Sequence, residues 1–238
     1  MFDTKLPLYV YCVLIALIAN IIVVISLSRK YNYKIKETIF LVLFENFGII
    51  LGAKLYWFFE NMEKAQYKFD FFSSGMSSYG GLFGTLICII LFKIIFKKNL
   101  KELLYIFIPQ ISIMYSISKI GCFLVGCCYG IEYNGIGKVI YNYSIYHENP
   151  TYLFPVQIVE SIVFMAIFIY NMVVHKKNNY DMKTVGINFI MCGFAKFALE
   201  FLRASHVGVI LSSTQFVSIL FISLGIVIYA KKKLEERN

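Results

Sequence analysis

A short stretch near the middle of the chain holds reactive residue types within an apolar sequence. Residues 119–130 contain one cation, Lys119, with three thiols and three glycines. Three thiols suggest a metal site, but Cys127 and Cys128 are adjacent and no histidine is near them in sequence. On a continuous helix Cys122 and Cys127 would also point apart by more than about 100°. We therefore expect no metal, redox centre or cofactor in this stretch.

Further candidate residues are charged or polar positions inside other apolar segments. Lys196, Glu200 and Arg203 are spaced by four and three residues, which predicts that they share one helical face. The simpler alternative is a structural ion pair between Lys196 and Glu200. Gln157 and Glu160 lie in the first turns of another segment, where a carboxylate also suits the positive end of a helix.

Lys54 accompanies Glu45 in an apolar segment, where charges are costly and are functional candidates, although the two could form a structural pair. Tyr79 opens the next segment and is followed by two glycines. Glycines permit either close helix packing or a phosphate cradle, and packing is the simpler explanation. The glycines to which both alternatives apply are Gly80, Gly81, Gly84, Gly121, Gly126 and Gly130.

The segments that carry these residues are apolar enough to cross a membrane. The chain has 238 residues, of which 59% are hydrophobic and 16% charged, far from the composition of soluble domains. Apolar blocks of roughly 17 to 24 residues alternate with short charged loops, as in membrane-spanning helices. We predict an all-α polytopic membrane protein with a single domain over 1–238. Seven spans are expected: 6–27, 38–59, 77–96, 103–117, 154–174, 185–202 and 214–230.

The loops between the spans alternate between basic and nearly neutral. Basic loops follow the first, third, fifth and seventh spans, which predicts an external N-terminus and a cytoplasmic C-terminus. Loop 60–78 and the Tyr-rich segment 131–153, which could form short strands, would then be external. The net charge of +9 comes largely from the cytoplasmic loops, where it meets anionic lipid headgroups rather than nucleic acid.

On this topology the polar candidates gather at the external ends of the helices. They are Tyr79, Lys119, Gln157, Glu160, Lys196, Glu200 and Arg203. Cations at the depth of phospholipid headgroups suit a site that binds phosphate, which predicts a lipid or lipid-phosphate substrate.

Five motifs, in order along the chain, resemble the prolipoprotein diacylglyceryl transferases of bacteria. They are Gly52-Ala53-Lys54-Leu55-Tyr56, Ser78-Tyr79-Gly80-Gly81-Leu82-Phe83-Gly84, the stretch Lys119 to Gly130, Phe154-Pro155-Val156-Gln157 with Glu160, and Lys196 to Arg203. Gln215 also falls at a family position in the last span. The family patterns differ in having histidine at Tyr79 and Phe154, arginine at Lys54, Lys119 and Lys196, and asparagine and glutamate at Cys122 and Cys127.

The resemblance implies a multi-pass enzyme of the bacterial cell membrane. It would transfer the diacylglyceryl group of phosphatidylglycerol to the lipobox cysteine in a prolipoprotein signal peptide, amid other membrane lipids and without nucleic acid. Catalysis would then fall to Lys119 and to Tyr79 as acid or base. The other implied substrate-binding positions are Lys54, Gly80, Gly81, Gly121, Gly130, Gln157, Glu160, Lys196, Glu200 and Arg203.

Two other functions are compatible with the sequence. A relative that binds lipid without catalysis, or that has a different target, would keep the fold and the cations while dispensing with this transfer reaction. The departures from the family motifs favour this alternative. A transporter or channel would need a polar path to the cytoplasmic side, and the inner halves of the segments are almost entirely apolar.

Overall fold

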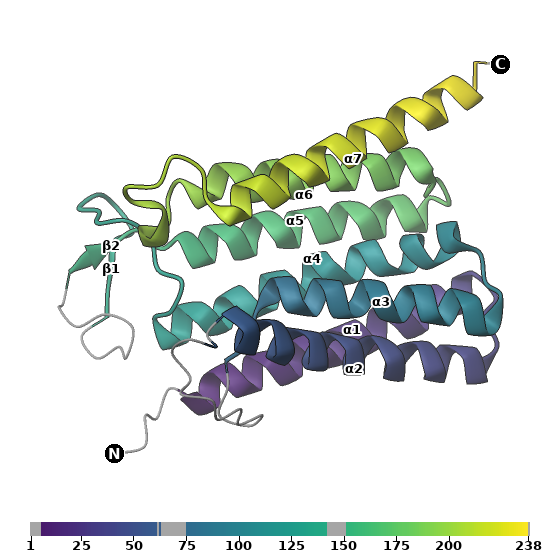
Figure 1. Ribbon diagram of the computed structural model, residues 1–238, viewed down its shortest axis with the longest axis horizontal. Helices are drawn as coiled ribbons and strands as arrows, with labels where there is room; N and C mark the ends of the chain where they lie inside the picture. The colour runs from purple at the N-terminus through teal and green to yellow at the C-terminus, as the bar shows by residue number, and fades with distance from the viewer. Residues whose placement is uncertain (1–5, 61, 63–74, 142–150, 238) are drawn as a thin grey trace. The chain divides into compact units, whose positions relative to one another are not determined.

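The structure, a computed structural model, describes residues 6–60, 62, 75–141 and 151–237. Most of the predicted external loop 60–78 lies outside the described residues. The helices in chain order are α1 (Leu6–Lys30), α2 (Ile35–Glu60), α3 (Ser78–Phe96), α4 (Leu100–Val125), α5 (Val156–Lys176), α6 (Met182–Glu200) and α7 (Ser213–Glu235) (Figure 1). A two-stranded sheet, β1 (Val139–Ile140) and β2 (Tyr152–Leu153), precedes α5, and a short helix η1 (Ala204–His206) follows α6.

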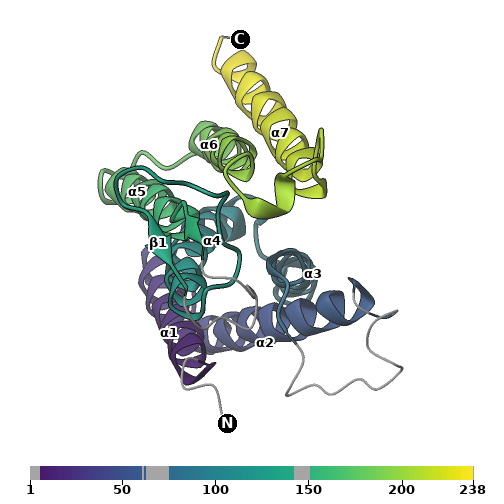
Figure 2. The same cartoon turned by 90° about the vertical axis from the view of Figure 1, so that its left-hand side faces the viewer.

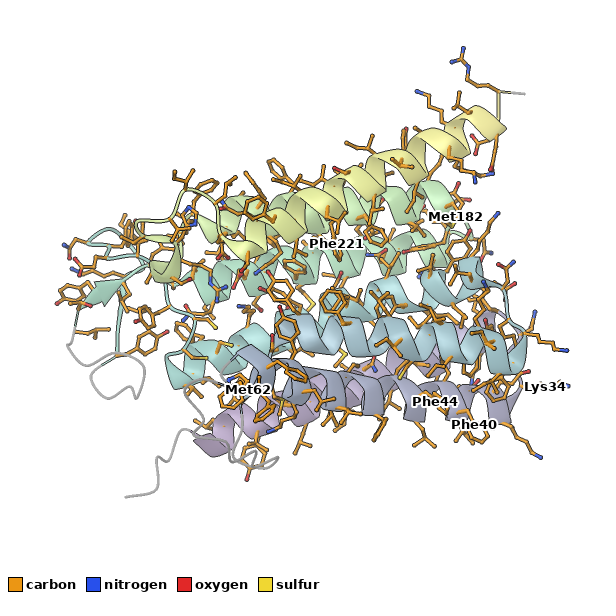
Figure 3. The ribbon with its side chains drawn as sticks, viewed as in Figure 1. Lys34, Phe40, Phe44, Met62, Met182 and Phe221 are labelled. Atoms are coloured by element: carbon orange, nitrogen blue, oxygen red, sulfur yellow. The ribbon has the colours of Figure 1, made fainter. Side chains whose placement is uncertain are left out.

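All seven helices are long and apolar enough to cross a membrane, so the prediction of a seven-span, all-α protein is confirmed. Their outward side chains agree with this. Large apolar residues on different helices are more than half exposed, such as Ile22 at 62%, Phe47 at 65% and Phe216 at 60%, a surface that lipid rather than water stabilises. Phe40 and Phe44 on α2 are labelled in Figure 3. The orientation of the termini stays a prediction.

Two helix ends differ from the predicted spans. α4 continues to Val125, well past the predicted end at residue 117, so Lys119 and Cys122 lie on the helix itself. α6 ends at Glu200, and Arg203 has an extended backbone with φ −94° and ψ 139°. The prediction that Lys196, Glu200 and Arg203 share one helical face is therefore wrong for Arg203.

The contacts divide the chain into two compact units, and α1 and α4 contribute to both. A single domain over 1–238 stays a prediction. In the unit of residues 21–107, α2 packs against α3 through glycines. A Cβ added to Gly80 would lie 2.2 Å from the carbonyl oxygen of Gly52, and one added to Gly84 would lie 2.0 Å from that of Gly48. Each helix therefore carries two glycines four residues apart that let the two backbones touch.

The second unit comprises residues 1–20 and 108–238. In it α6 packs along α7 and also contacts α5, so that α6 lies between them (Figure 2). Gly186 of α6 and Gly225 of α7 meet backbone to backbone, and the rings of Phe189 and Phe221 lie 5.2 Å apart beside them. A buried amide pair joins α5 to α6, since Asn171 donates a 2.6 Å hydrogen bond to Asn188. These contacts hold α5, α6 and α7 together within this unit.

Candidate functional site

The unit of residues 1–20 and 108–238 holds a buried carboxylate, Glu160, in the first turns of α5. Its Oε2 lies 2.8 Å from the ammonium nitrogen of Lys119 on α4, and its Oε1 accepts a 3.0 Å hydrogen bond from the ammonium group of Lys196 on α6. Glu160 is completely buried and Lys119 is nearly so. The structure thus brings three predicted residues together, with two cations sharing one carboxylate.

Sequence reasoning missed Tyr115, which completes this cluster. Its hydroxyl donates a 2.8 Å hydrogen bond to Oε1 of Glu160 and accepts one of 2.6 Å from Lys196. The ammonium group of Lys119 also lies 5.0 Å from the centre of the Tyr115 ring. Tyr115 precedes Lys119 by four residues, so the helical period could have placed both on one face of α4.

A second carboxylate, Glu200 at the end of α6, holds the third cation. Nη1 of Arg203 lies 3.5 Å from Oε2 of Glu200, and Oε1 of Glu200 accepts a 3.1 Å hydrogen bond from Ser212. Lys196 is thus paired with Glu160 rather than with Glu200. Ser212 and Gln215 form a capping box that starts α7, a pattern readable from their spacing in the sequence.

The guanidinium group of Arg203 is mostly buried, yet its Nε donates to no acceptor among the described residues. Burial opposes the charged form, but the negative charges of Cys128, Glu160 and Glu200 outweigh it and raise the pKa of Arg203 further above its ordinary value. Arg203 is therefore a permanent cation with an unused buried donor, which an anionic ligand can accept.

Main-chain hydrogen bonds join the segment after α4 to the ends of its neighbours. The amide of Ile131 donates to the carbonyl of Leu202 at 3.0 Å, and that of Phe154 donates to Ile131 at 3.0 Å. A Cβ on Gly130 would lie 2.3 Å from the Phe154 carbonyl oxygen and 2.9 Å from that of Leu202. Gly130 is thus required for close backbone packing, and its predicted contact with a headgroup stays a prediction.

Two further predicted residues support the same segment. Gln157 is fully buried and donates a 2.8 Å hydrogen bond to the carbonyl of Cys127. Gly121 faces α1, since an added Cβ would lie 3.0 Å from Cβ of Cys12 and 3.1 Å from the ring of Tyr9. Both residues therefore position the end of α4, and substrate contacts by either stay predictions.

The remaining predicted residues belong to the unit of residues 21–107. Lys54 is buried on α2, and the ring of Tyr79 lies 6.4 Å from that of Tyr56. Gly80 packs against Gly52, whereas a Cβ on Gly81 would lie 3.6 Å from its nearest neighbour, an ordinary contact. Participation of Lys54, Tyr79, Gly80 and Gly81 in one site with Lys119 stays a prediction.

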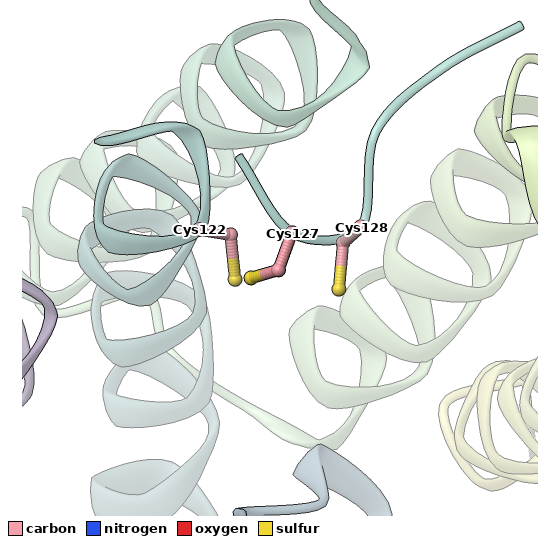
Figure 4. Close-up of side chains that lie close together, drawn as sticks. All are labelled: Cys122, Cys127 and Cys128. Atoms are coloured by element: carbon pink, nitrogen blue, oxygen red, sulfur yellow. The ribbon is translucent and has the colours of Figure 1, made fainter. Parts of the chain in front are cut away.

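The three thiols of the sequence stretch converge in space (Figure 4). α4 ends at Val125, Gly126 has a φ of +79°, and the amides of Gly126 and Cys127 both donate to the carbonyl of Cys122. This turn brings the sulfur atoms of Cys122, Cys127 and Cys128 within 4.8 Å of one another. The geometric argument against a shared thiol site is therefore wrong, because Cys127 does not continue the helix.

The two adjacent thiols, those of Cys127 and Cys128, differ in their affinity for protons. Hydrogen bonds from Cys122 and Cys127, helped by the cations of Lys119 and Arg203, hold the pKa of Cys128 well below its usual range. A hydrogen bond with Cys122 lowers the pKa of Cys127, but its hydrogen bond to Cys128 and its burial together raise that pKa to about 12. Negative charge in the cluster is therefore concentrated on Cys128.

Comparisons with known proteins agree with the geometry. The family model described as prolipoprotein diacylglyceryl transferase matches residues 1–231. The chain is 30% identical over 195 residues to phosphatidylglycerol–prolipoprotein diacylglyceryl transferase 2 of Clostridium perfringens, covering 79% of this chain and 76% of that protein. It is 27% identical over 233 residues to the enzyme of Clostridium tetani, covering 94% and 93%. The Finegoldia magna enzyme is 25% identical over 243 residues, covering 98% and 93%.

Proposed function

Because the chain belongs to the prolipoprotein diacylglyceryl transferase family, we propose that it transfers the diacylglyceryl group of phosphatidylglycerol to a prolipoprotein cysteine thiol. The product would be a thioether-linked lipoprotein precursor, and glycerol phosphate would leave. In this proposal the reaction takes place at the external face of the bacterial cell membrane, and the acceptor is the lipobox cysteine of a signal peptide.

The observation that carries the proposal is the charge balance at Glu160. Three cations, Lys119, Lys196 and Arg203, face two carboxylates, Glu160 and Glu200, so the cations outnumber the carboxylates by one. These cations would attract the negatively charged phosphodiester of the lipid. The unused Nε donor of Arg203 offers that ligand a charge-assisted hydrogen bond.

The chemistry is a displacement at carbon. The acceptor sulfur, as a thiolate, attacks the carbon of the diacylglyceryl group that bears the phosphate. A carbon–sulfur bond forms as the bond between that carbon and the phosphate oxygen breaks. The electron pair of that bond goes to the phosphate oxygen, where negative charge grows as glycerol phosphate leaves. Lys119, Lys196 and Arg203 would stabilise this charge, and Glu200 would hold Arg203 in place.

Residues of the other unit complete the proposal. Tyr79 would accept or donate the proton of the reaction, and Lys54, Gly80 and Gly81 would contact the lipid headgroup. Gly121, Gly130, Gln157 and Glu160 would shape the substrate-binding region around Lys119. The ordinary pKa of tyrosine, about 10, makes it a weak base at neutral pH, so activation of the acceptor thiol needs further support.

The experiment combines the purified full-length protein with phosphatidylglycerol and a synthetic lipobox peptide. Mass spectrometry would detect the mass added to the peptide. We expect product with the unsubstituted protein, and a loss of about a hundredfold or more in rate with Lys119→Ala or Arg203→Ala. Lys183→Ala is the matched control, because Lys183 forms an exposed ion pair with Glu236. Equal rates for all four proteins would overturn the assignment of the cations.

The rival function, lipid binding without transfer, gives a different result. The unsubstituted protein would then retain phosphatidylglycerol through purification, and the Arg203→Ala variant would retain less of it. The peptide would stay unmodified with both proteins. Complementation of a bacterial strain depleted of its own transferase separates the two functions in cells, since only an active enzyme restores growth.

A further inference from the structure

The cluster of Cys122, Cys127 and Cys128, which the proposed reaction leaves without a role, has the geometry of a metal site. The three sulfur atoms lie within 4.8 Å of one another (Figure 4). Thiolates bound to one zinc ion at about 2.3 Å lie about 3.8 to 4.0 Å apart. Small rotations of the side chains would therefore bring all three sulfur atoms to bonding distance of one ion.

The main chain holds this arrangement in place. The left-handed Gly126 turns the chain at the end of α4, and Gln157 fixes the carbonyl of Cys127 by a 2.8 Å hydrogen bond. Gly130, two residues after Cys128, forms an antiparallel β-bridge with Arg203. Cys128 itself has a φ of +53°, a strained conformation for a residue with a side chain. Such strain persists where the surrounding structure enforces it, as at ligand-binding sites.

The donor set selects the kind of ion. Sulfur ligands favour zinc or copper(I) over magnesium or calcium, and zinc brings no redox chemistry of its own. Within the part of the chain that the structure describes, this is the one convergent group of three or more ligating side chains. Cys122 is buried, whereas Cys127 and Cys128 are less buried, so an ion can enter from the side of Cys127 and Cys128.

The neighbouring charges also suit a thiolate-bound ion. Three thiolates and one zinc ion carry one net negative charge. Lys119 and Arg203 are close enough to Cys128 to interact with it electrostatically, and they favour negative charge at the thiol cluster. The same two cations belong to the proposed phosphate site, so the thiol cluster and that site adjoin.

We propose that Cys122, Cys127 and Cys128 bind one zinc ion as thiolates and that its fourth coordination position takes the acceptor thiol of the transfer. Three protein ligands with one open position are the arrangement of catalytic rather than structural zinc sites. Coordination would remove the thiol proton to solvent at neutral pH, which a tyrosine base does poorly. The sulfur would then attack the glycerol carbon, and the thioether product would leave the ion. The second half of this proposal rests on the proposed function.

Metal binding is tested without any transfer reaction. The reduced, metal-free, full-length protein is titrated with zinc against a coloured chelator, and with cobalt(II) as a spectroscopic probe. We expect one ion per chain and a thiolate-to-cobalt charge-transfer band. Cys122→Ser, Cys127→Ser and Cys128→Ser should each weaken zinc binding by more than the roughly 10- to 100-fold that loss of an outer-shell partner costs. Cys88→Ser and Cys192→Ser, which alter cysteines outside the cluster, should not weaken it.

A measurement on the unsubstituted protein guards against variants that fail to fold. Zinc should protect Cys122, Cys127 and Cys128 from alkylation, read by mass spectrometry of peptides, and should leave the labelling of Cys192 unchanged. Absence of binding and of protection overturns the metal site. So does equal zinc affinity in Cys122→Ser, Cys127→Ser and Cys128→Ser.

The acceptor role has its own readout. Adding the lipobox peptide to the cobalt-loaded protein should shift the charge-transfer band, and a peptide with serine in place of its cysteine should not. Zinc binding without that shift overturns the acceptor role. If metal removal leaves the rate of transfer unchanged, the acceptor role fails while the proposed function stands. If the peptide cysteine binds cobalt but no lipid is transferred, the proposed function fails and the metal site stands.

Discussion

Lys119 and Glu160 form a buried ion pair of 2.8 Å that links α4 to α5. Glu160 also pairs with Lys196, so two ammonium groups share its carboxylate. Replacing Glu160 by Gln keeps the shape of the side chain and leaves both cations without their partner. We expect a loss of about 3 to 5 kcal/mol of stability, measured by unfolding in detergent.

The control for that substitution is Glu236→Gln, which removes the partner of exposed Lys183. Exposed pairs contribute little, so the control should unfold like the original protein. Equal stability of Glu160→Gln and the original protein would show that the two lysines do not depend on Glu160.

Arg203 and lysine should not be interchangeable at position 203. Arg203 pairs with Glu200 and keeps a further buried donor at Nε, and a lysine ammonium group cannot present donors in that planar arrangement. We expect Arg203→Lys to transfer lipid more slowly than the original protein and faster than Arg203→Ala. Initial rates over a series of phosphatidylglycerol concentrations measure this, and full activity of Arg203→Lys contradicts a geometric role for the guanidinium group.

Adjacent glycines on α3 should respond differently to alanine. A Cβ on Gly80 meets the backbone of Gly52 at 2.2 Å, whereas one on Gly81 makes only ordinary contacts. We expect Gly80→Ala to destabilise the protein by about 1 to 3 kcal/mol and Gly81→Ala to leave its unfolding temperature unchanged. If Gly81→Ala nevertheless slows transfer, the loss of activity comes from a disturbed contact with the lipid headgroup and not from disturbed helix packing.

The reactivity of the two adjacent thiols should separate with pH in the metal-free protein. Because the pKa of Cys128 lies well below its usual range, its thiolate persists to lower pH than that of an ordinary cysteine, and its alkylation should slow at a lower pH than that of Cys127. Cys127, with a pKa of about 12, should react only at strongly alkaline pH. Peptide mass spectrometry after timed alkylation measures both rates. Arg203→Ala should move the midpoint for Cys128 to higher pH, since Arg203 favours its thiolate, and an unchanged midpoint rules that influence out.

The seven helices could be predicted from the sequence because span length and hydropathy are local properties. The end of α4 could not be predicted in this way. Val125 is as apolar as the residues before it, and the helix ends there because the chain makes a left-handed turn at Gly126. The convergence of the cysteines follows from that turn, and so was missed with it.

The charged residues of the cluster were predicted from the sequence, but which cation pairs with which carboxylate was not. The spacing offered a pair between Lys196 and Glu200 along one helix as the simpler alternative, but Lys196 pairs across helices with Glu160. That choice depends on how α5 and α6 pack, which the spacing within α6 does not contain. Tyr115 was missed because a tyrosine in an apolar helix resembles any other buried aromatic residue until its partners are known.

The segment around Gly130 joins three helix ends through amide and carbonyl groups, at Leu202, Ile131 and Phe154. Main-chain hydrogen bonds are insensitive to the identity of most side chains. The neighbouring side chains, those of Cys127 and Cys128 among them, can therefore be replaced without removing these main-chain bonds. Gly130 is the exception in this segment, because its position leaves no room for a Cβ.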